Sequence, residues 1–105
     1  MTNMINVTAK GASGTTYSLS IHPLETAFKA LGGIYIVIAE TVGELSALYV
    51  GQTGNLTERF DNHHKARFWQ QRSANRIAIL LESVESKRLH IESDLIAGLN
   101  PPCNG

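Results

Sequence analysis

The spacing of apolar and polar residues changes several times along the chain, and each change marks the boundary of a predicted element. Residues 6–10 and 15–21 are rich in extended-type residues and flank a turn-prone Gly-Ala-Ser-Gly at 11–14, a pattern that predicts a β-hairpin. After Pro23, apolar residues recur at helical spacing until Gly32, which predicts a short helix.

Three later runs of apolar, often β-branched residues predict buried strands. They cover residues 34–39, 48–50 and 76–81, and turn-prone residues at 41–46 separate the first two. We therefore predict an α+β domain with a central three-stranded sheet flanked by helices, plus the N-terminal hairpin. The sequence leaves open whether that hairpin extends the sheet, covers an edge or forms an oligomer contact.

Two longer helices are predicted where the helical spacing returns. The first covers about residues 56–71, with Asn55 as its expected N-cap and Glu58 as the reciprocal capping partner. The second covers residues 86–99 and is expected to end before the Asn-Pro-Pro that follows.

The second predicted helix carries a carboxylate within an otherwise apolar row. One of its faces contains, at helical spacing, Leu89, Glu92, Ile96 and Leu99. A carboxylate that faces a core is costly unless something pairs with it, and a functional site is one source of such a partner. A slight rotation of the helix that lets Glu92 reach water accounts for the pattern equally well.

The composition is that of an ordinary globular protein. The chain has 105 residues, of which 43% are hydrophobic and 17% charged, so we expect one domain over residues 1–105, with the hairpin and short helix in 1–31 and the rest in 32–105. No apolar run approaches the roughly 18 residues of a membrane span, and no secretory signal is visible, so a cytoplasmic protein without a membrane partner is expected. Cys103 is the only cysteine, which excludes an internal disulfide framework.

Charge is unevenly distributed although the formal net charge is zero. Between residues 59 and 76 the basic residues outnumber the single acidic residue, Asp61, and aromatic and histidine side chains are interleaved with them. Such a surface favours contact with nucleic-acid phosphates, and a solvated helix face is the simpler alternative. The candidate nucleic-acid-binding residues are Arg59, Lys65, Arg67, Arg72 and Arg76.

Several short segments occur in the order of a known set of nuclease motifs. A Gly-Ile-Tyr triplet at 33–35 opens one predicted strand, and a Tyr-Val-Gly triplet at 49–51 closes the next. The later pieces lie on the two long predicted helices and at the C-terminal end: Arg59, His63, Glu92 and Asn104. Over about residues 32–104 the chain resembles the GIY-YIG nuclease family, which includes the catalytic domain of a DNA-repair excinuclease and certain homing endonucleases.

The resemblance implies a DNA endonuclease of the kind used in DNA repair, which depends on Mg2+ or Mn2+ and acts on double-stranded or branched DNA. It further implies two active-site tyrosines, a phosphate-binding arginine, a helix histidine, a metal-binding glutamate and a C-terminal asparagine, here Tyr35, Tyr49, Arg59, His63, Glu92 and Asn104. Two positions depart from the family pattern. Val50 replaces the usual isoleucine. Gln52 stands where some members have a lysine, so the resemblance does not identify which group assists the base.

The chemistry of phosphodiester hydrolysis accounts for these residue types. The reaction requires an activated water, in-line attack and neutralisation of the charge that develops on the phosphate. Glu92 offers a hard oxygen ligand for a magnesium-like ion, and Arg59 offers paired donors for a phosphate. We expect Tyr35 or Tyr49 to orient or deprotonate the water, with His63 assisting.

Other interpretations stay open. The chain can instead be a module that keeps the nuclease fold and binds nucleic acid or a protein without cutting, or a domain whose motif residues only pack. A partner protein or a second copy of the chain would supply targeting, since no sequence-reading module is visible. A zinc site is disfavoured because adjacent histidines on a helix point about 100° apart; its ligands would be His63, His64, His90 and Cys103.

Overall fold

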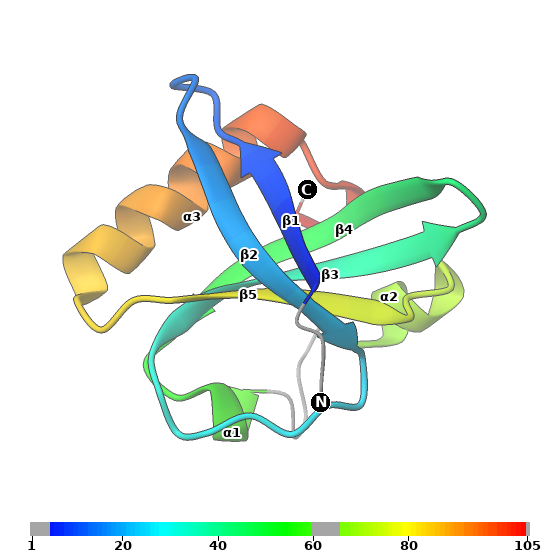
Figure 1. Cartoon of the computed structure of the whole chain (residues 1–105), viewed down its shortest axis with the longest axis horizontal. Coiled ribbons are helices and arrows are strands. Elements are labelled where there is room, and N and C mark those ends of the chain that lie inside the picture. The colour runs from blue at the N-terminus through cyan, green and yellow to red at the C-terminus, as the bar shows by residue number, and fades with distance from the viewer. Residues whose placement is uncertain (1–4, 60–65, 105) are drawn as a thin grey trace.

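Five antiparallel strands form one curled sheet in the order β1-β2-β5-β3-β4 (Figure 1). The computed structural model describes residues 5–59 and 66–104, without the side chains of residues 58 and 59. The strands are β1 Ile5–Lys10, β2 Thr16–Pro23, β3 Gly33–Thr41, β4 Glu44–Thr53 and β5 Arg76–Leu81. The helices are α1 Leu56–Arg59, α2 Ala66–Gln71, α3 Glu85–Leu99 and the 3-10 helix η1 Pro102–Asn104. The predicted α+β class is confirmed.

The first hairpin belongs to the main sheet, so the predicted three-stranded sheet has five strands. β2 pairs with β5, with Ser20 opposite Ile79. Without β2, β5 would be an edge strand with a row of unpaired backbone groups, and the pairing satisfies them. In Figure 1 the first hairpin crosses the other three strands at a steep angle, as expected for a strongly twisted sheet.

The prediction of a short helix after Pro23 is wrong, because residues 24–32 form a turn followed by irregular chain. The carbonyl of Phe28 accepts a hydrogen bond from Thr57 Oγ1 (2.7 Å). The N–H of Leu24 donates to the carbonyl of Asn75, directly before β5, and the carbonyl of Leu31 accepts from the N–H of Leu56, the first residue of α1. These tertiary hydrogen bonds replace the bonds that a helix would have made.

Both faces of the sheet are covered, because side chains along each strand alternate between them. The face that packs against Leu95 of α3 contains Leu19, Ile34, Ile36, Ile38, Val50 and Ala78. The opposite face, called the aromatic face below, contains Tyr35, Val37, Leu48, Tyr49, Leu56, Trp69, Ile77, Ile79 and Cys103. Helices α1 and α2 therefore contribute to the aromatic face, and α3 to the other.

Helix α3 lies within one residue of its predicted bounds, and Ile96 and Leu99 of the predicted apolar row are partly buried against the sheet. Its most buried side chains, however, lie outside that row. Arg88 and Leu95 are buried, whereas Leu89 is 46% exposed. Leu95 is fully buried in the cluster on the adjacent sheet face, and this orientation of the helix turns Arg88 inward and Leu89 outward. Asn100 adopts a left-handed conformation (φ 47°) and donates its N–H to the carbonyl of Ile96 (2.9 Å), which confirms the predicted end of the helix.

Helices α1 and α2 lie at the two ends of the predicted helix 56–71. Residues 60–65 between them are outside the described part of the chain. Among the helices that are described, none is long and apolar enough to cross a membrane.

Asp94 on α3 holds the first hairpin against that helix. Its carboxylate accepts hydrogen bonds from Ser13 N–H (2.8 Å), Ser13 Oγ (2.7 Å) and Tyr17 Oη (2.7 Å). Gly98 permits the close approach, since a Cβ there would lie 2.6 Å from the carbonyl oxygen of Lys10. The hydrogen bonds from Ser13, and then that from Tyr17, hold the pKa of Asp94 below its usual value.

Asp94→Asn is expected to lower the free energy of unfolding at neutral pH, because a neutral amide binds Ser13 and Tyr17 less strongly than an ionised carboxylate does. Since the pKa of Asp94 is lowered by folding, its contribution is present above the unfolded-state value of about 4 and is lost as the pH falls through the folded-state value. The difference in Tm between wild type and variant should therefore narrow in acid. Thermal unfolding followed by circular dichroism measures it.

Glu44→Gln, which removes an exposed carboxylate at the β3–β4 turn, is the control for loss of charge. A gap in Tm for Asp94→Asn that stays constant down to about pH 2 would contradict the prediction.

Candidate active site

The two motif tyrosines lie side by side on the aromatic face. Tyr35 is in β3 and Tyr49 in β4, with ring centroids 6.0 Å apart and ring planes inclined by 31°. Trp69 of α2 continues the row, with its ring 5.6 Å from that of Tyr49. Tyr35 is fully buried and Tyr49 is 8% exposed. Of the two, Tyr49 is therefore the residue with access to solvent.

The glycine of the Tyr-Val-Gly triplet is required by the ring of Tyr35. Gly51 lies directly opposite Tyr35 in the β3–β4 ladder. A Cβ on Gly51 would overlap with Cζ and Oη of Tyr35. The phenol thus lies across the β4 backbone at the one residue that has no side chain to displace it.

Asn104 binds the outer edge of β4 at the middle residue of the same triplet. The N–H of Val50 donates to Asn104 Oδ1 (2.8 Å), and Asn104 Nδ2 donates to the carbonyl of Val50 (2.9 Å). The side-chain amide supplies one acceptor and one donor in a plane, as a neighbouring strand would. Asn104 therefore fixes the backbone between Tyr49 and Gly51.

Helix α1 begins at Leu56, three residues after the last residue of β4. Asn55 Oδ1 accepts a hydrogen bond from Thr57 N–H (3.0 Å), which confirms Asn55 as the N-cap. Arg59 is the last residue of α1, and its side chain lies outside the described part of the chain, as do His63 and Lys65.

Glu92 is half-buried on α3, one turn beyond Arg88, a site residue that was not predicted. Arg88 is 6% exposed and donates its Nε–H to Gln52 Oε1 (3.0 Å), a bond that ties α3 to the end of β4. Its Nη2 atom lies 3.5 Å from the position that a Cβ on Gly54 would take, directly before the N-cap of α1. The side chain of Arg88 therefore extends from α3 to the segment between β4 and α1.

The sequence signal for Arg88 is weak. Arg88 and Leu95 are seven residues apart, as buried residues of one helix face are, but an arginine in a helix is normally assigned to solvent. The carbonyl groups of residues 82 and 83, which accept hydrogen bonds from its Nη1 (3.1 and 3.0 Å), stabilise the buried side chain. That contact depends on the path of the chain between β5 and α3.

Helix α3 and the tyrosine rings lie on opposite faces of the sheet. Leu95 of α3 belongs to the same buried cluster as Val50, whereas the two motif tyrosines belong to the aromatic face. β4 is the last strand of the sheet. Any site that combines Glu92 with the tyrosines must therefore lie around the outer edge of β4.

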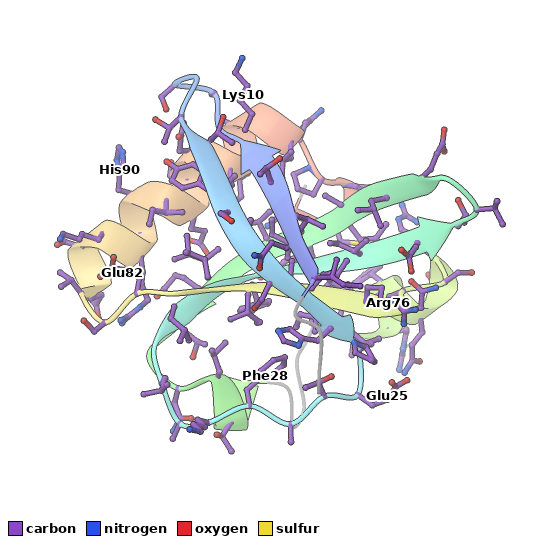
Figure 2. All side chains as sticks on the ribbon, viewed as in Figure 1. Lys10, Glu25, Phe28, Arg76, Glu82 and His90 are labelled. Atoms are coloured by element: carbon purple, nitrogen blue, oxygen red, sulfur yellow. The ribbon has the colours of Figure 1, made fainter. Side chains whose placement is uncertain are left out.

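The described residues of the predicted basic surface are Arg67, Arg72 and Arg76, and Arg76 lies away from this edge. Arg67 on α2 and Arg72 directly after it are exposed. Arg76 begins β5 and forms an ion pair with Glu40 (Nε–Oε1 3.0 Å). Figure 2 shows Arg76 at the start of β5 and Glu82 just beyond its other end. Six residues at about 3.3 Å per strand residue separate the two by roughly 20 Å. Arg76 thus serves a different part of the surface from the β4–α3 junction.

Metal-binding side chains are dispersed in the described part of the chain, which contains no group of three or more His, Cys, Asp or Glu residues that could hold a metal ion. Glu92 by itself fits an ion of the magnesium type, which commonly takes one or two protein carboxylates and keeps several waters. The described candidates for zinc lie apart: Cys103 is buried on the aromatic face, and His90 projects outward from α3 (Figure 2).

No family model, no curated protein and no solved structure matches this chain. The resemblance to GIY-YIG nucleases thus depends on the motif residues themselves. Their function has to be argued from geometry and chemistry.

Asn104→Ala is expected to lower the free energy of unfolding by about 1 to 3 kcal/mol, because two hydrogen bonds to the β4 backbone are lost. Urea unfolding measures the change. Asn6→Ala, at an exposed position of β1, is the matched control and should change stability by less than about 0.5 kcal/mol. An equally small effect of Asn104→Ala would show that the edge of β4 does not need this amide.

Gly51→Ala is expected to cost about 1 to 3 kcal/mol, because the new methyl group displaces the ring of Tyr35. The cost should be smaller in a Tyr35→Leu background, where the ring is absent. Chemical unfolding of both single variants and the double variant tests this coupling. Strictly additive losses would show that Gly51 is required for another reason.

Proposed function

We propose that this chain is a divalent-metal-dependent endonuclease of the GIY-YIG type that hydrolyses phosphodiester bonds in DNA. The observation that carries the proposal is the meeting of three motif pieces at β4. The ring of Tyr35 lies across the backbone of Gly51, and the ring of Tyr49 lies beside that of Tyr35. Asn104 binds the backbone of Val50, the middle residue of the Tyr-Val-Gly triplet. Short motifs that match by chance have no reason to meet in space.

The residues of the site take distinct roles in this proposal. Tyr49, the tyrosine with access to solvent, orients the attacking water, and His63 assists the proton transfer. Arg59 stays charged at every relevant pH and binds the phosphate through paired donors. Glu92 would hold Mg2+ or Mn2+, which supplies neutralisation of the charge that develops on the phosphate. Tyr35 positions Tyr49 by filling the space above the β4 backbone.

Double-stranded or branched DNA is the proposed substrate. Arg67 and Arg72 are exposed and can bind DNA phosphates away from the cleaved bond. Lys65 is a further cation proposed to bind such phosphates. The charge of Arg76 is shared with Glu40, so its contribution to binding is expected to be smaller. Targeting to a particular structure would come from a partner protein or a second copy of the chain.

A second candidate function is a module that binds nucleic acid or a protein without cutting it. The burial of the tyrosines favours it, because Tyr35 is fully buried and Tyr49 is nearly so. Tyrosines with this exposure commonly serve packing. Cleavage assays separate the two candidates.

The purified protein should nick supercoiled plasmid and cut branched DNA when Mg2+ or Mn2+ is present. Glu92→Ala and Arg59→Ala are each expected to reduce the cleavage rate by about 100-fold or more, because each removes a group that acts on the reacting phosphate. Tyr49→Phe should reduce the rate more than Tyr35→Phe does. Glu85→Gln, which changes an exposed carboxylate on the same helix, is the control and should leave the rate unchanged.

Equal nicking by all these proteins would indicate a contaminating nuclease and refute the enzymatic proposal. Salt-sensitive DNA binding without cleavage would favour the second candidate.

A further inference from the structure

Arg88 is a buried cation whose hydrogen-bond partners are all neutral. Its side chain is 6% exposed. Nε–H donates to Gln52 Oε1 (3.0 Å), and Nη1 donates to the carbonyls of Glu82 (3.1 Å) and Ser83 (3.0 Å). These bonds hold the guanidinium in one orientation at the junction of β4, β5 and α3.

No ion pair joins this guanidinium to a carboxylate among the described residues. The ion pair found among them joins Arg76 and Glu40. Removing a cation from water is costly unless an anion compensates it, and neutral carbonyls compensate only in part. An anion that binds here would therefore gain from a charge already dehydrated and oriented.

One nitrogen of the guanidinium, Nη2, has N–H donors that the described residues do not use. Nη2 of Arg88 makes no hydrogen bond within the described part of the chain, whereas Nε and Nη1 are both engaged. Nη2 lies 3.5 Å from the position that a Cβ on Gly54 would take, and Gly54 is exposed. On the Nη1 side, a Cβ on Gly32 would lie only 2.6 Å away, so glycine is required there. The guanidinium is thus enclosed on one side and bordered by an exposed glycine on the other.

We propose that Arg88 is a phosphate-binding residue, with Nη2 donating to a non-bridging oxygen of a DNA backbone phosphate beside Gly54. The inference rests on the proposed function, because that function brings DNA to the end of β4. A lysine could not take this role, since only a guanidinium can bond three fixed carbonyl oxygens and still offer a further N–H pair. Gln52 acts through Arg88 as a positioning residue.

Gln52→Glu tests the inference without removing Arg88, whose loss would also remove three structural hydrogen bonds. Glutamate has the shape of glutamine and keeps an acceptor for Nε–H, but its charge neutralises the guanidinium. We expect Gln52→Glu to have a Tm equal to or higher than that of the wild type. Binding to a short fluorescent DNA duplex should be about tenfold weaker, and the salt dependence of the binding constant should fall by about one phosphate contact. Fluorescence anisotropy in the presence of a chelator, over a series of salt concentrations, measures binding without cleavage.

Asn6→Asp is the matched control, because it makes the same amide-to-carboxylate change at an exposed position of β1, the opposite edge strand of the sheet. It should leave affinity within about twofold of wild type, as expected for a remote charge screened by salt. Equal losses for the two variants would reduce the effect to net charge and overturn the inference. Unchanged binding by Gln52→Glu, or no binding of the duplex by the wild type, would overturn it as well.

Plasmid cleavage measured in parallel separates this inference from the proposed function. A specific loss of binding in Gln52→Glu with no cleavage by the wild type would support Arg88 as a phosphate contact and refute the proposed endonuclease activity. Cleavage by the wild type with unchanged binding by Gln52→Glu would keep the enzyme and remove the role of Arg88.

Discussion

The contact between the Tyr35 ring and the bare backbone of Gly51 is the constraint on which the candidate site depends. It fixes which residues of β3 and β4 stand opposite each other, and thereby places Tyr49 beside Tyr35 on the aromatic face. A slip of one residue in this register would move one strand's side chains to the other face of the sheet. The register shift between Val37 and Ile38 lies beyond this contact, toward the β3–β4 turn, and so leaves the tyrosine pair intact.

The outer edge of β4 is where the C-terminal part of the chain meets the motif strands. Asn104 pairs with the backbone of Val50, and Arg88 binds the side chain of Gln52 two residues further on. An edge strand with unpaired backbone groups invites pairing with other chains, so these contacts protect it. The same contacts bring α3, which carries Glu92, to the end of β4 from which α1 starts. Protection of the edge and assembly of the site thus have one structural cause.

Parts of the candidate site could be predicted because they depend on local pattern. The two triplets mark adjacent strands, and Asn55 caps the next helix through a bond to a residue two positions away. The burial of Arg88 could not be predicted, because its partners come from β4 and from the turn before α3. The ion pair of Arg76 with Glu40 is equally non-local, since β3 and β5 meet only through the sheet.

Sequence pattern located the β-hairpin, the three later strands and α3, because alternating and periodic patterns record which side chains avoid water. The extent of β4 was missed: it covers Glu44–Thr53 and so begins within residues 41–46, which were expected to form a turn. Three features followed from long-range contacts alone: the hairpin pairs with β5, residues 24–32 are irregular, and α3 turns Arg88 inward. The physical reason is that backbone donors and buried charges need partners, and the chain supplies those partners from segments far away in sequence. Local pattern tells which residues are buried more readily than what they are buried against.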